Sequence, residues 1–407
     1  MSSLTAEPTE RTLAAWALSA LDASGSRCSE WLGRFRAESL SRLEADGFPR
    51  PQEDAWRNMG LDGLLKPVWR RAEDRSLLTL PPSQSGVELK SWDDLAKMPD
   101  PSAGRLESGP FASFNAAFMD KAFSVRAARN VCCLQPLRFT PEPRKGSAAG
   151  WMINPRASVL LEPGSRLDLI LDLSQLPAEQ GLLNLVMDIQ LCDQTALNLV
   201  VAGADSEAAI SLLDLSVLQG RDSVFRLFAL ETQAAQSRIE LAASLQGQNA
   251  STDLFGLALL GKASRVFHHF RVDHRVPHTQ SQQVFKSVLG GEARYEFDSL
   301  ATIHPEAPHC SSEQLNKNLV LSDSARAYAR PQLAIHTDEV QCHHGATVGQ
   351  MSAEELLYLR TRGIHPAAAS SLIMRGFVDD LLKEIPVSSA VADLQRRAHA
   401  RLEEIAQ

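Results

Sequence analysis

Two residues whose types suit chemistry stand close together near the C-terminal end of the chain, Cys342 and His344. In an extended segment their side chains face the same side, about 7 Å apart along the strand. A thiol beside an imidazole can form a nucleophile–base pair or bind a soft metal ion. A satisfied pair inside a protein core is a common alternative, so this spacing by itself leaves both interpretations open.

A second group of histidines, His268, His269, His274 and His278, falls within eleven residues. On a strand, His268 and His274 share one face, while His269 and Asp273 share the other. Histidine and aspartate side chains ligate iron and zinc, but this spacing matches no closed metal motif. We therefore interpret the group as exposed or hydrogen-bonded strand residues.

The segment from Gly256 to Lys262 has the GxxxxGK spacing of a phosphate loop. A phosphate loop needs Ser or Thr directly after the lysine to hold magnesium, and Ala263 stands there. The following residues read as a strand rather than as the start of a helix. We interpret the match as chance and do not expect the chain to bind ATP by itself. Serine-hydrolase, zinc-protease and EF-hand motifs do not occur either.

Composition excludes several classes of protein. The 407-residue chain is 44% hydrophobic and 22% charged, which is ordinary globular usage, and its net charge of −8 argues against nucleic-acid binding. No apolar run approaches the roughly 18 residues of a membrane-spanning helix, and the N-terminus lacks a signal-peptide pattern. The six cysteines show no CxxC spacing, which favours free thiols in a reducing compartment. We expect a soluble, cytoplasmic protein that binds neither nucleic acid nor membrane.

The elements that must position these residues change along the chain. Apolar residues at helical spacing predict helices over 11–23 and 28–43, and the proline-containing break at 47–52 ends the second. Between residues 111 and 344, short runs alternate apolar and polar residues and are separated by Gly, Asp, Ser, Gln and Asn. This pattern allows a parallel β-helix, and a sandwich with insertions fits nearly as well.

The last 55 residues return to helical patterns. Ser352 and Glu355 form a capping box, Gly363 suits a left-handed C-cap, and Pro366 suits the first turn of the next helix. That helix stops before Pro386, and a final helix follows. The three helices are equally compatible with a docking surface and with a simple covering layer on the β region.

Several segments resemble landmarks of one protein family, in the family's order, across about residues 45–385. They are GFP at 47–49 with Glu53 and Trp56, FNAAF at 114–118, QQVFKSVLGGEAR at 282–294, NLVLS at 318–322, PQLAI at 331–335, VQCHHGATVG at 340–349 and LLYLRTRGI at 356–364. Together they resemble the SufB/SufD family of iron–sulfur cluster assembly proteins. The HGATVG and YLRTRGI forms are more similar to SufD than to SufB.

The resemblance implies a mainly β fold with helical ends. It implies a right-handed parallel β-helix core at 106–349 between an N-terminal helical domain at 1–105 and a C-terminal helical domain at 350–407. It further implies a SufD-like scaffold of a SufBCD complex rather than an enzyme. Such a subunit pairs with a SufB-like subunit and docks a SufC-like ATPase, which explains the missing phosphate loop.

The resemblance also implies roles for particular residues. The family's functional histidine maps onto His344, with Cys342 two residues before it, so this pair is expected at the cluster-assembly interface, where it would handle iron or sulfide transiently. The ATPase-docking residues are expected in the C-terminal helices, at Tyr358, Arg360, Arg362 and Gly363. No cofactor is expected to stay bound to this chain alone, because a nascent iron–sulfur cluster would need ligands from the SufB-like partner.

Two other hypotheses compete with the scaffold. One is a homodimeric β-helix protein with a structural role and no cluster chemistry, since strand edges can pair symmetrically. The other is a β-helix enzyme that acts on a polymer, which the absence of an acidic cluster disfavours.

Overall fold

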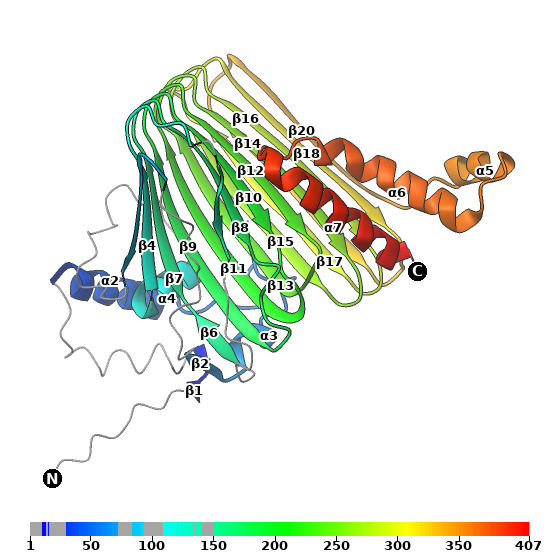
Figure 1. The fold of residues 1–407 in the computed structure, drawn as a ribbon, viewed down its shortest axis with the longest axis horizontal. Helices are drawn as coiled ribbons and strands as arrows, with labels where there is room; N and C mark the ends of the chain where they lie inside the picture. Colours follow the sequence, from blue (N-terminus) through cyan, green and yellow to red (C-terminus); the bar gives the residue numbers. More distant parts are fainter. Residues whose placement is uncertain are drawn as a thin grey trace, which may run out of the picture.

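The structure, a computed structural model, describes residues 10–13, 15, 30–71, 84–92, 109–119, 121–133, 135–140 and 150–406. Two sheets of mainly parallel strands run side by side through the molecule, and helices lie near both ends of the chain (Figure 1). The described chain is therefore mainly β with helical ends and has a parallel β-helix core, which confirms the predicted fold class.

From residue 155 onward, successive strands alternate between the two sheets, so that each pair of strands makes one turn of the β-helix. The first sheet contains β1 (Glu10–Arg11), β2 (Trp69–Arg71), β3 (Val87–Trp92), β4 (Lys121–Ala127), β6 (Trp151–Ile153), β7 (Pro155–Leu161), β9 (Gly181–Leu191), β11 (Asp205–Gln219), β13 (Gln233–Leu245), β15 (Arg265–His274), β17 (Arg294–Ile303) and β19 (Arg326–Ile335). The second contains β5 (Leu137–Phe139), β8 (Arg166–Asp172), β10 (Ala196–Ala202), β12 (Val224–Glu231), β14 (Ser251–Leu260), β16 (Gln280–Leu289), β18 (Cys310–Val320) and β20 (Val340–Gly349).

The apolar residues of the period-2 pattern point inward and fill the core of the β-helix. Leu169, Leu199, Leu227 and Leu254 pair in register on consecutive strands of the second sheet, and all four are buried in the same cluster. Stacking of like apolar side chains one turn apart removes them from water without any helix covering them.

The polar residues between the strands close the turns. Asp222 and Asn249 have φ of 57° and 60°, in the left-handed region that Asn, Asp and Gly tolerate best. The Asn249 amide also donates to Asp222 Oδ1 at 2.9 Å, which links one turn to the next. These conformations explain why such residues separate the strand-like runs.

Other segments cover the outer faces of the sheets. Against the first sheet pack α2 (Glu30–Asp46), α3 (Asp62–Leu65), α4 (Pro110–Phe118) and the loop that joins α2 to α3. The predicted helix at 28–43 corresponds to α2, whereas the one at 11–23 lies largely outside the described residues. The domain boundaries near residues 105 and 349 stay a prediction.

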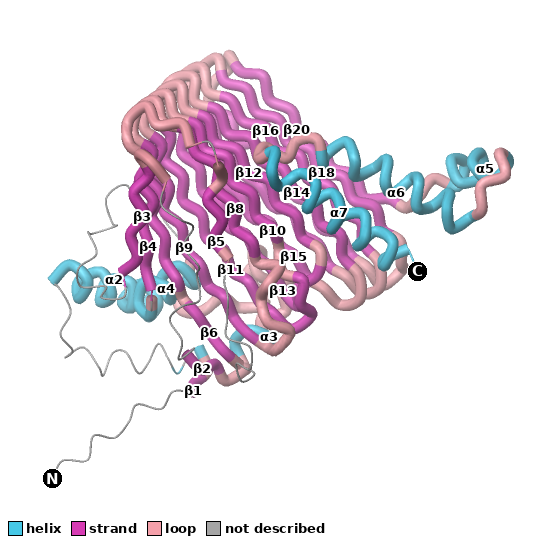
Figure 2. The backbone as a smooth tube through the Cα atoms, in the orientation of Figure 1, coloured by secondary structure: helices cyan, strands magenta, loops and turns pink. Residues whose placement is uncertain are grey.

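At the C-terminal end, α6 (Pro366–Leu382) and α7 (Ser388–Ala406) lie across the second sheet, while α5 (Ala353–Thr361) projects away from it (Figure 2). The predicted caps are confirmed: Ser352 Oγ accepts from the Glu355 backbone amide at 3.3 Å, Gly363 has φ of +83°, and Pro366 begins α6. No described helix is long and apolar enough to cross a membrane.

The phosphate-loop-like segment is part of the β-helix. Gly256 lies within β14, and Lys262 occupies the turn before β15, so no helix follows it. The interpretation of a chance match is confirmed. Gly256 has a packing role instead, since a Cβ at this position would lie 2.3 Å from the buried ring of Phe285.

Replacing Gly256 with alanine should lower the free energy of unfolding by about 2 kcal/mol, because the Phe285 ring has to shift inside a filled core. Urea unfolding followed by circular dichroism measures this change. The matched control is Gly349→Ala, where the added methyl meets nothing within 4 Å. Equal unfolding midpoints for the two variants would contradict the packing role.

Candidate functional site

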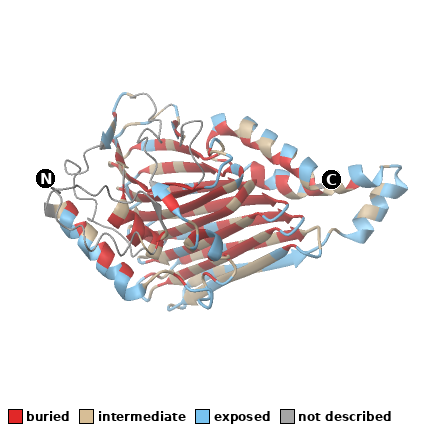
Figure 3. Ribbon diagram, turned by 90° about the horizontal axis from the view of Figure 1, so that it is seen from below, coloured by how far each residue is buried: buried red, intermediate tan, exposed pale blue. Residues whose placement is uncertain are grey.

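The last turn of the β-helix is an open end. Within the described chain, β19 pairs only with β17 and β20 pairs only with β18, so each of these ten-residue strands presents a free edge. Central strands are mostly buried, whereas residues of β19 and β20 are intermediate or exposed, as a view of the burial shows (Figure 3). A long uncovered strand edge is a template for pairing with another chain.

The interior turns polar towards this end. In β18, the inward-facing positions carry Ser312, Gln314, Asn316 and Asn318, all of them buried. They bond to one another and to neighbouring strands; for example, the Asn318 amide donates to Asn316 Oδ1 at 2.6 Å. Hydrogen-bonded amides suit this part of the interior, because only the last turn of the β-helix separates it from solvent.

Cys342 lies on β20 over this polar interior. It is half-buried and packs beside Cys310 in a small cluster at the open end. Burial raises the pKa of the Cys342 thiol; a hydrogen bond with the Ser312 backbone partly offsets this effect, and the neighbouring Cys310 adds to it. The thiol is therefore protonated at neutral pH, and binding of a metal ion or sulfur would have to displace that proton.

Cys310 is a second thiol that sequence reasoning did not assign to the site. Val340 is its register partner on β20, so Cys310 and Cys342 are diagonal neighbours on adjacent strands. Both residues stand at the start of their strands, one turn apart, which is the signal that could have identified the pair. The two sulfurs and His344 therefore occupy the same end of the β-helix.

A chain of hydrogen bonds connects this end to a buried imidazole. Thr279 Oγ1 lies 3.1 Å from Cys310 Sγ and 2.8 Å from His274 Nδ1. His274 Nε2 lies 2.9 Å from Ser281 Oγ, whose hydroxyl donates to Ser312 Oγ at 2.9 Å. Both ring nitrogens of His274 are thus occupied, and the network fixes the strands that carry the two thiols.

His344 follows Cys342 by two residues on β20, in register with Gln314 of β18. Its side chain is exposed and makes no hydrogen bond or ion pair with another described residue. An uncommitted imidazole on a free edge can serve as a metal ligand or as a proton acceptor.

Three of the four grouped histidines, His268, His269 and His274, lie on β15 and are hydrogen-bonded, as the sequence predicted for strand residues. His268 and His274 face the interior and are fully buried, and His268 Nδ1 lies 3.2 Å from the Tyr295 hydroxyl. Burial lowers the pKa of His268 to about 3 and that of His274 to about 4. His278 lies in the following turn and stacks on His309, with ring centroids 5.0 Å apart.

His269 faces outward, where Glu296 and Asp298 join it from β17. Donor atoms of the three side chains all lie within 4.8 Å of one another, as in a small metal site. Arg330 already supplies positive charge there, 3.0 Å from Asp298 Oδ2 and 3.7 Å from Glu296 Oε1. Burial alone would raise the pKa of Glu296, but hydrogen bonds from His269 and Asn58 outweigh it and lower that pKa.

Because the Asn58 amide donates to Glu296 and the Arg330 guanidinium donates to the Asp54 carbonyl, this cluster ties the loop before α3 to the β-helix. The carboxylates are satisfied by side chains of the protein itself. The geometry therefore supports an anchoring role for the cluster.

The four residues expected to dock an ATPase lie on or next to α5, which buries none of its residues. Tyr358 is 60% exposed and Arg360 is exposed. The Arg362 guanidinium lies 5.3 Å from the centre of the Tyr358 ring, and Gly363 ends the helix. Leu357, 59% exposed, extends the same uncovered apolar surface.

These features define a class of protein: a parallel β-helix that offers free strand edges, two thiols and an imidazole at one end and an exposed helix beyond it. Comparison with known families narrows the class. Residues 145–377 match the family described as "SUF system FeS cluster assembly, SufBD core domain". Because the match spans more than half of the chain, the protein belongs to the SufB/SufD family and has a role in iron–sulfur cluster assembly.

Individual relatives support the same assignment. An iron–sulfur cluster assembly SufBD family protein of Synechocystis is 26% identical over 383 residues, covering 89% of this chain and 81% of its own. One from Mycobacterium bovis is 24% identical over 393 residues, covering 92% and 94%. The iron–sulfur cluster assembly protein SufD of Escherichia coli is 29% identical over 148 residues, covering 36% and 35%.

Proposed function

We propose that the chain is the SufD-like scaffold subunit of a SufBCD-type complex that assembles iron–sulfur clusters, and that it is not itself an enzyme. The observation that carries the proposal is the free edge of β20, with His344 exposed on it and Cys342 beside Cys310 beneath it. A SufB-like subunit pairs with this edge. The cluster is a cargo that forms transiently between the two subunits, with ligands from both.

In this proposal, the SufC-like ATPase binds at α5, around Leu357 and Tyr358. Exposed large apolar side chains on a projecting helix favour a protein partner. ATP hydrolysis in that partner would move the C-terminal helices relative to the β-helix and rearrange the interface that holds His344.

The proposal is tested by anaerobic co-expression with cognate SufB-like and SufC-like subunits, followed by affinity purification and native mass spectrometry. We expect a ternary complex with iron–sulfur absorption. A chain that forms only a homodimer through its strand edge, in the presence of both partners, would favour the alternative of a structural protein without cluster chemistry.

Leu357→Asp should weaken ATPase binding at least about tenfold, because it places a charge at the centre of an apolar contact. Pairing with the SufB-like subunit should stay unchanged, since the open end of the β-helix is untouched. The matched control is Val68→Asp, which changes a side chain of similar exposure, 51%, near the N-terminal end. Equal ATPase affinities for the two variants in titration calorimetry would refute docking at α5.

A further inference from the structure

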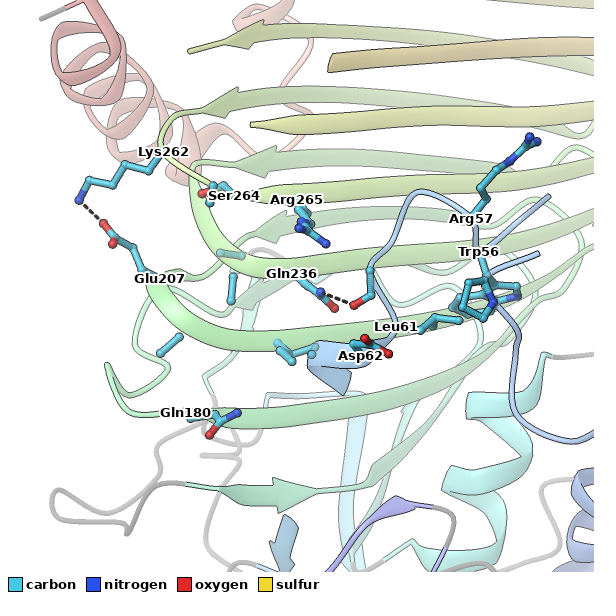
Figure 4. Close-up of a pocket in the computed structure, with 18 residues that line it drawn as sticks. Trp56, Arg57, Leu61, Asp62, Gln180, Glu207, Gln236, Lys262, Ser264 and Arg265 are labelled. Carbon is cyan, nitrogen blue, oxygen red and sulfur yellow. Dashed lines mark hydrogen bonds and ion pairs between the residues drawn. The ribbon is translucent and has the colours of Figure 1, made fainter. Parts of the chain in front are cut away.

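A large cavity lies between the loop at 51–63 and the outer face of the first sheet, away from the open end of the β-helix. Its volume is about 850 Å³. Leu61 lines the loop side, and Ile210 and Ala234 line the sheet side, so much of the wall is apolar. Arg265 and Gln236 project from the sheet into the space between these walls (Figure 4).

Arg265 lines this cavity and has no carboxylate partner among the described residues. The acids around the cavity already have partners: Asp62 pairs with Lys66 at 2.7 Å, and Glu207 pairs with Lys262 at the rim. Arg265 forms no ion pair with any described carboxylate, and it donates a hydrogen bond from Nη1 to the Met59 carbonyl at 3.4 Å. Its guanidinium therefore brings net positive charge to a partly enclosed space.

Two more arginines continue the row of positive charge on the neighbouring strands, beyond the residues that line the cavity. Arg265, Arg294 and Arg326 are the first residues of β15, β17 and β19, and they pair in register. Neighbouring strands are about 4.8 Å apart, and like charges directly opposite each other destabilise a sheet. No described carboxylate forms an ion pair with any of the three. Burial and the nearby Arg294 both lower the pKa of Arg265.

The backbone leaves room for the guanidinium. Gly60 has φ of +70°, and a Cβ at this position would lie 1.7 Å from Arg265 Nη1. Any larger residue at position 60 would push the guanidinium away from the Met59 carbonyl. A second hydrogen bond holds the same loop, since Gln236 Nε2 donates to the Gly60 carbonyl at 3.1 Å. The close approach of loop and side chain fixes Arg265 at the cavity wall.

We propose that this cavity binds a small organic phosphate. The phosphate groups lie against the Arg265 guanidinium, because a planar guanidinium group pairs bidentately with phosphate oxygens. The organic body lies in the cavity against its apolar wall residues, which include Leu61 and Ile210, and an inorganic ion has no body to make that contact. This site is separate from the cluster-assembly residues, and it does not depend on the proposed function.

Titration calorimetry on the full chain tests the site with two probes, ADP and inorganic pyrophosphate. We expect ADP to bind saturably at one site, at least about tenfold more tightly than pyrophosphate, since only ADP has a body to bury. Equal affinities would overturn the assignment of an organic ligand. The absence of saturable binding by both probes would overturn the site altogether.

Arg265→Gln should weaken ADP binding at least about tenfold. The matched control is Arg226→Gln, an arginine on the outer face of the other sheet that pairs with Asp253 at 3.2 Å, which should leave the affinity within about twofold. Unfolding midpoints in urea verify that both variants are folded. A folded Arg265→Gln variant with unchanged affinity would refute the proposal even if ADP binds elsewhere.

Discussion

Alanine in place of His344 should reduce the iron–sulfur absorption of the co-expressed complex about tenfold or more, while the subunits still assemble. The expected size follows from the cost of removing a metal-site group, which reaches ten- to a hundredfold even for outer-shell residues. Assembly should survive because the exposed His344 side chain makes no hydrogen bond or ion pair with another described residue, so its removal leaves the fold of the edge strand intact. Anaerobic absorption spectra and iron content per complex, with native mass spectrometry for assembly, measure both effects.

The matched control is His343→Ala. His343 is the next residue of the same strand, is also exposed, and faces the opposite side of β20. If any change in the edge strand disturbs the cluster, both variants should lose cluster content equally. If His344 itself takes part in cluster assembly, only the His344→Ala complex should lose it. An unchanged cluster content in an intact His344→Ala complex would leave His344 with a structural role only.

The protein should lose much of its stability between pH 6.5 and pH 4, because the buried His268 and His274 stay neutral in the folded state. Their pKa values of about 3 and about 4 lie below the ordinary 6.5, so in this range the unfolded chain binds protons that the folded chain does not. The stability that the two histidines contribute is complete above pH 6.5 and is lost as the pH falls through their folded-state pKa values. It amounts to about 5 kcal/mol for His268 and about 3 kcal/mol for His274.

Glu231 acts in the opposite direction. It is fully buried, and burial raises the pKa of Glu231 to about 7, so its contribution is complete below pH 4.5 and is lost as the pH rises to 7. This contribution is about 3 kcal/mol, smaller than the two histidines together. The net stability should therefore still decrease on acidification.

Urea unfolding at pH 7.5, 6 and 5 measures the acid slope. His274→Gln removes one titrating group and should flatten the slope, although it also lowers stability at pH 7.5, because His274 bonds to Thr279 and Ser281. Glu231→Gln should make stability fall more steeply on acidification, because it removes the group whose contribution grows as the pH falls. It is therefore the matched variant with the opposite expected effect. An acid slope that is the same in wild type and both variants would contradict neutral burial of these groups.

The sequence by itself determined the local features of this protein. Alternating apolar residues predicted the strands and their inward faces, Asn, Asp and Gly marked the turns, and Ser352, Gly363 and Pro366 located the C-terminal helix ends. These features depend on neighbours within a few residues, which is the range over which backbone sterics and capping act. Family motifs then decided between a β-helix and a sandwich, which the alternation alone left nearly equal.

Only the tertiary structure decided which distant residues meet. The turns of this β-helix differ in length, so no fixed sequence period indicates which residues stack. The strand register alone places Cys310 beside Cys342 at the open end and aligns Arg265 with Arg294 and Arg326 across the sheet. The thiol pair arises from that register, because it places residues of successive turns on adjacent strands, and the cavity arises because the loop at 51–63 packs over the start of β15.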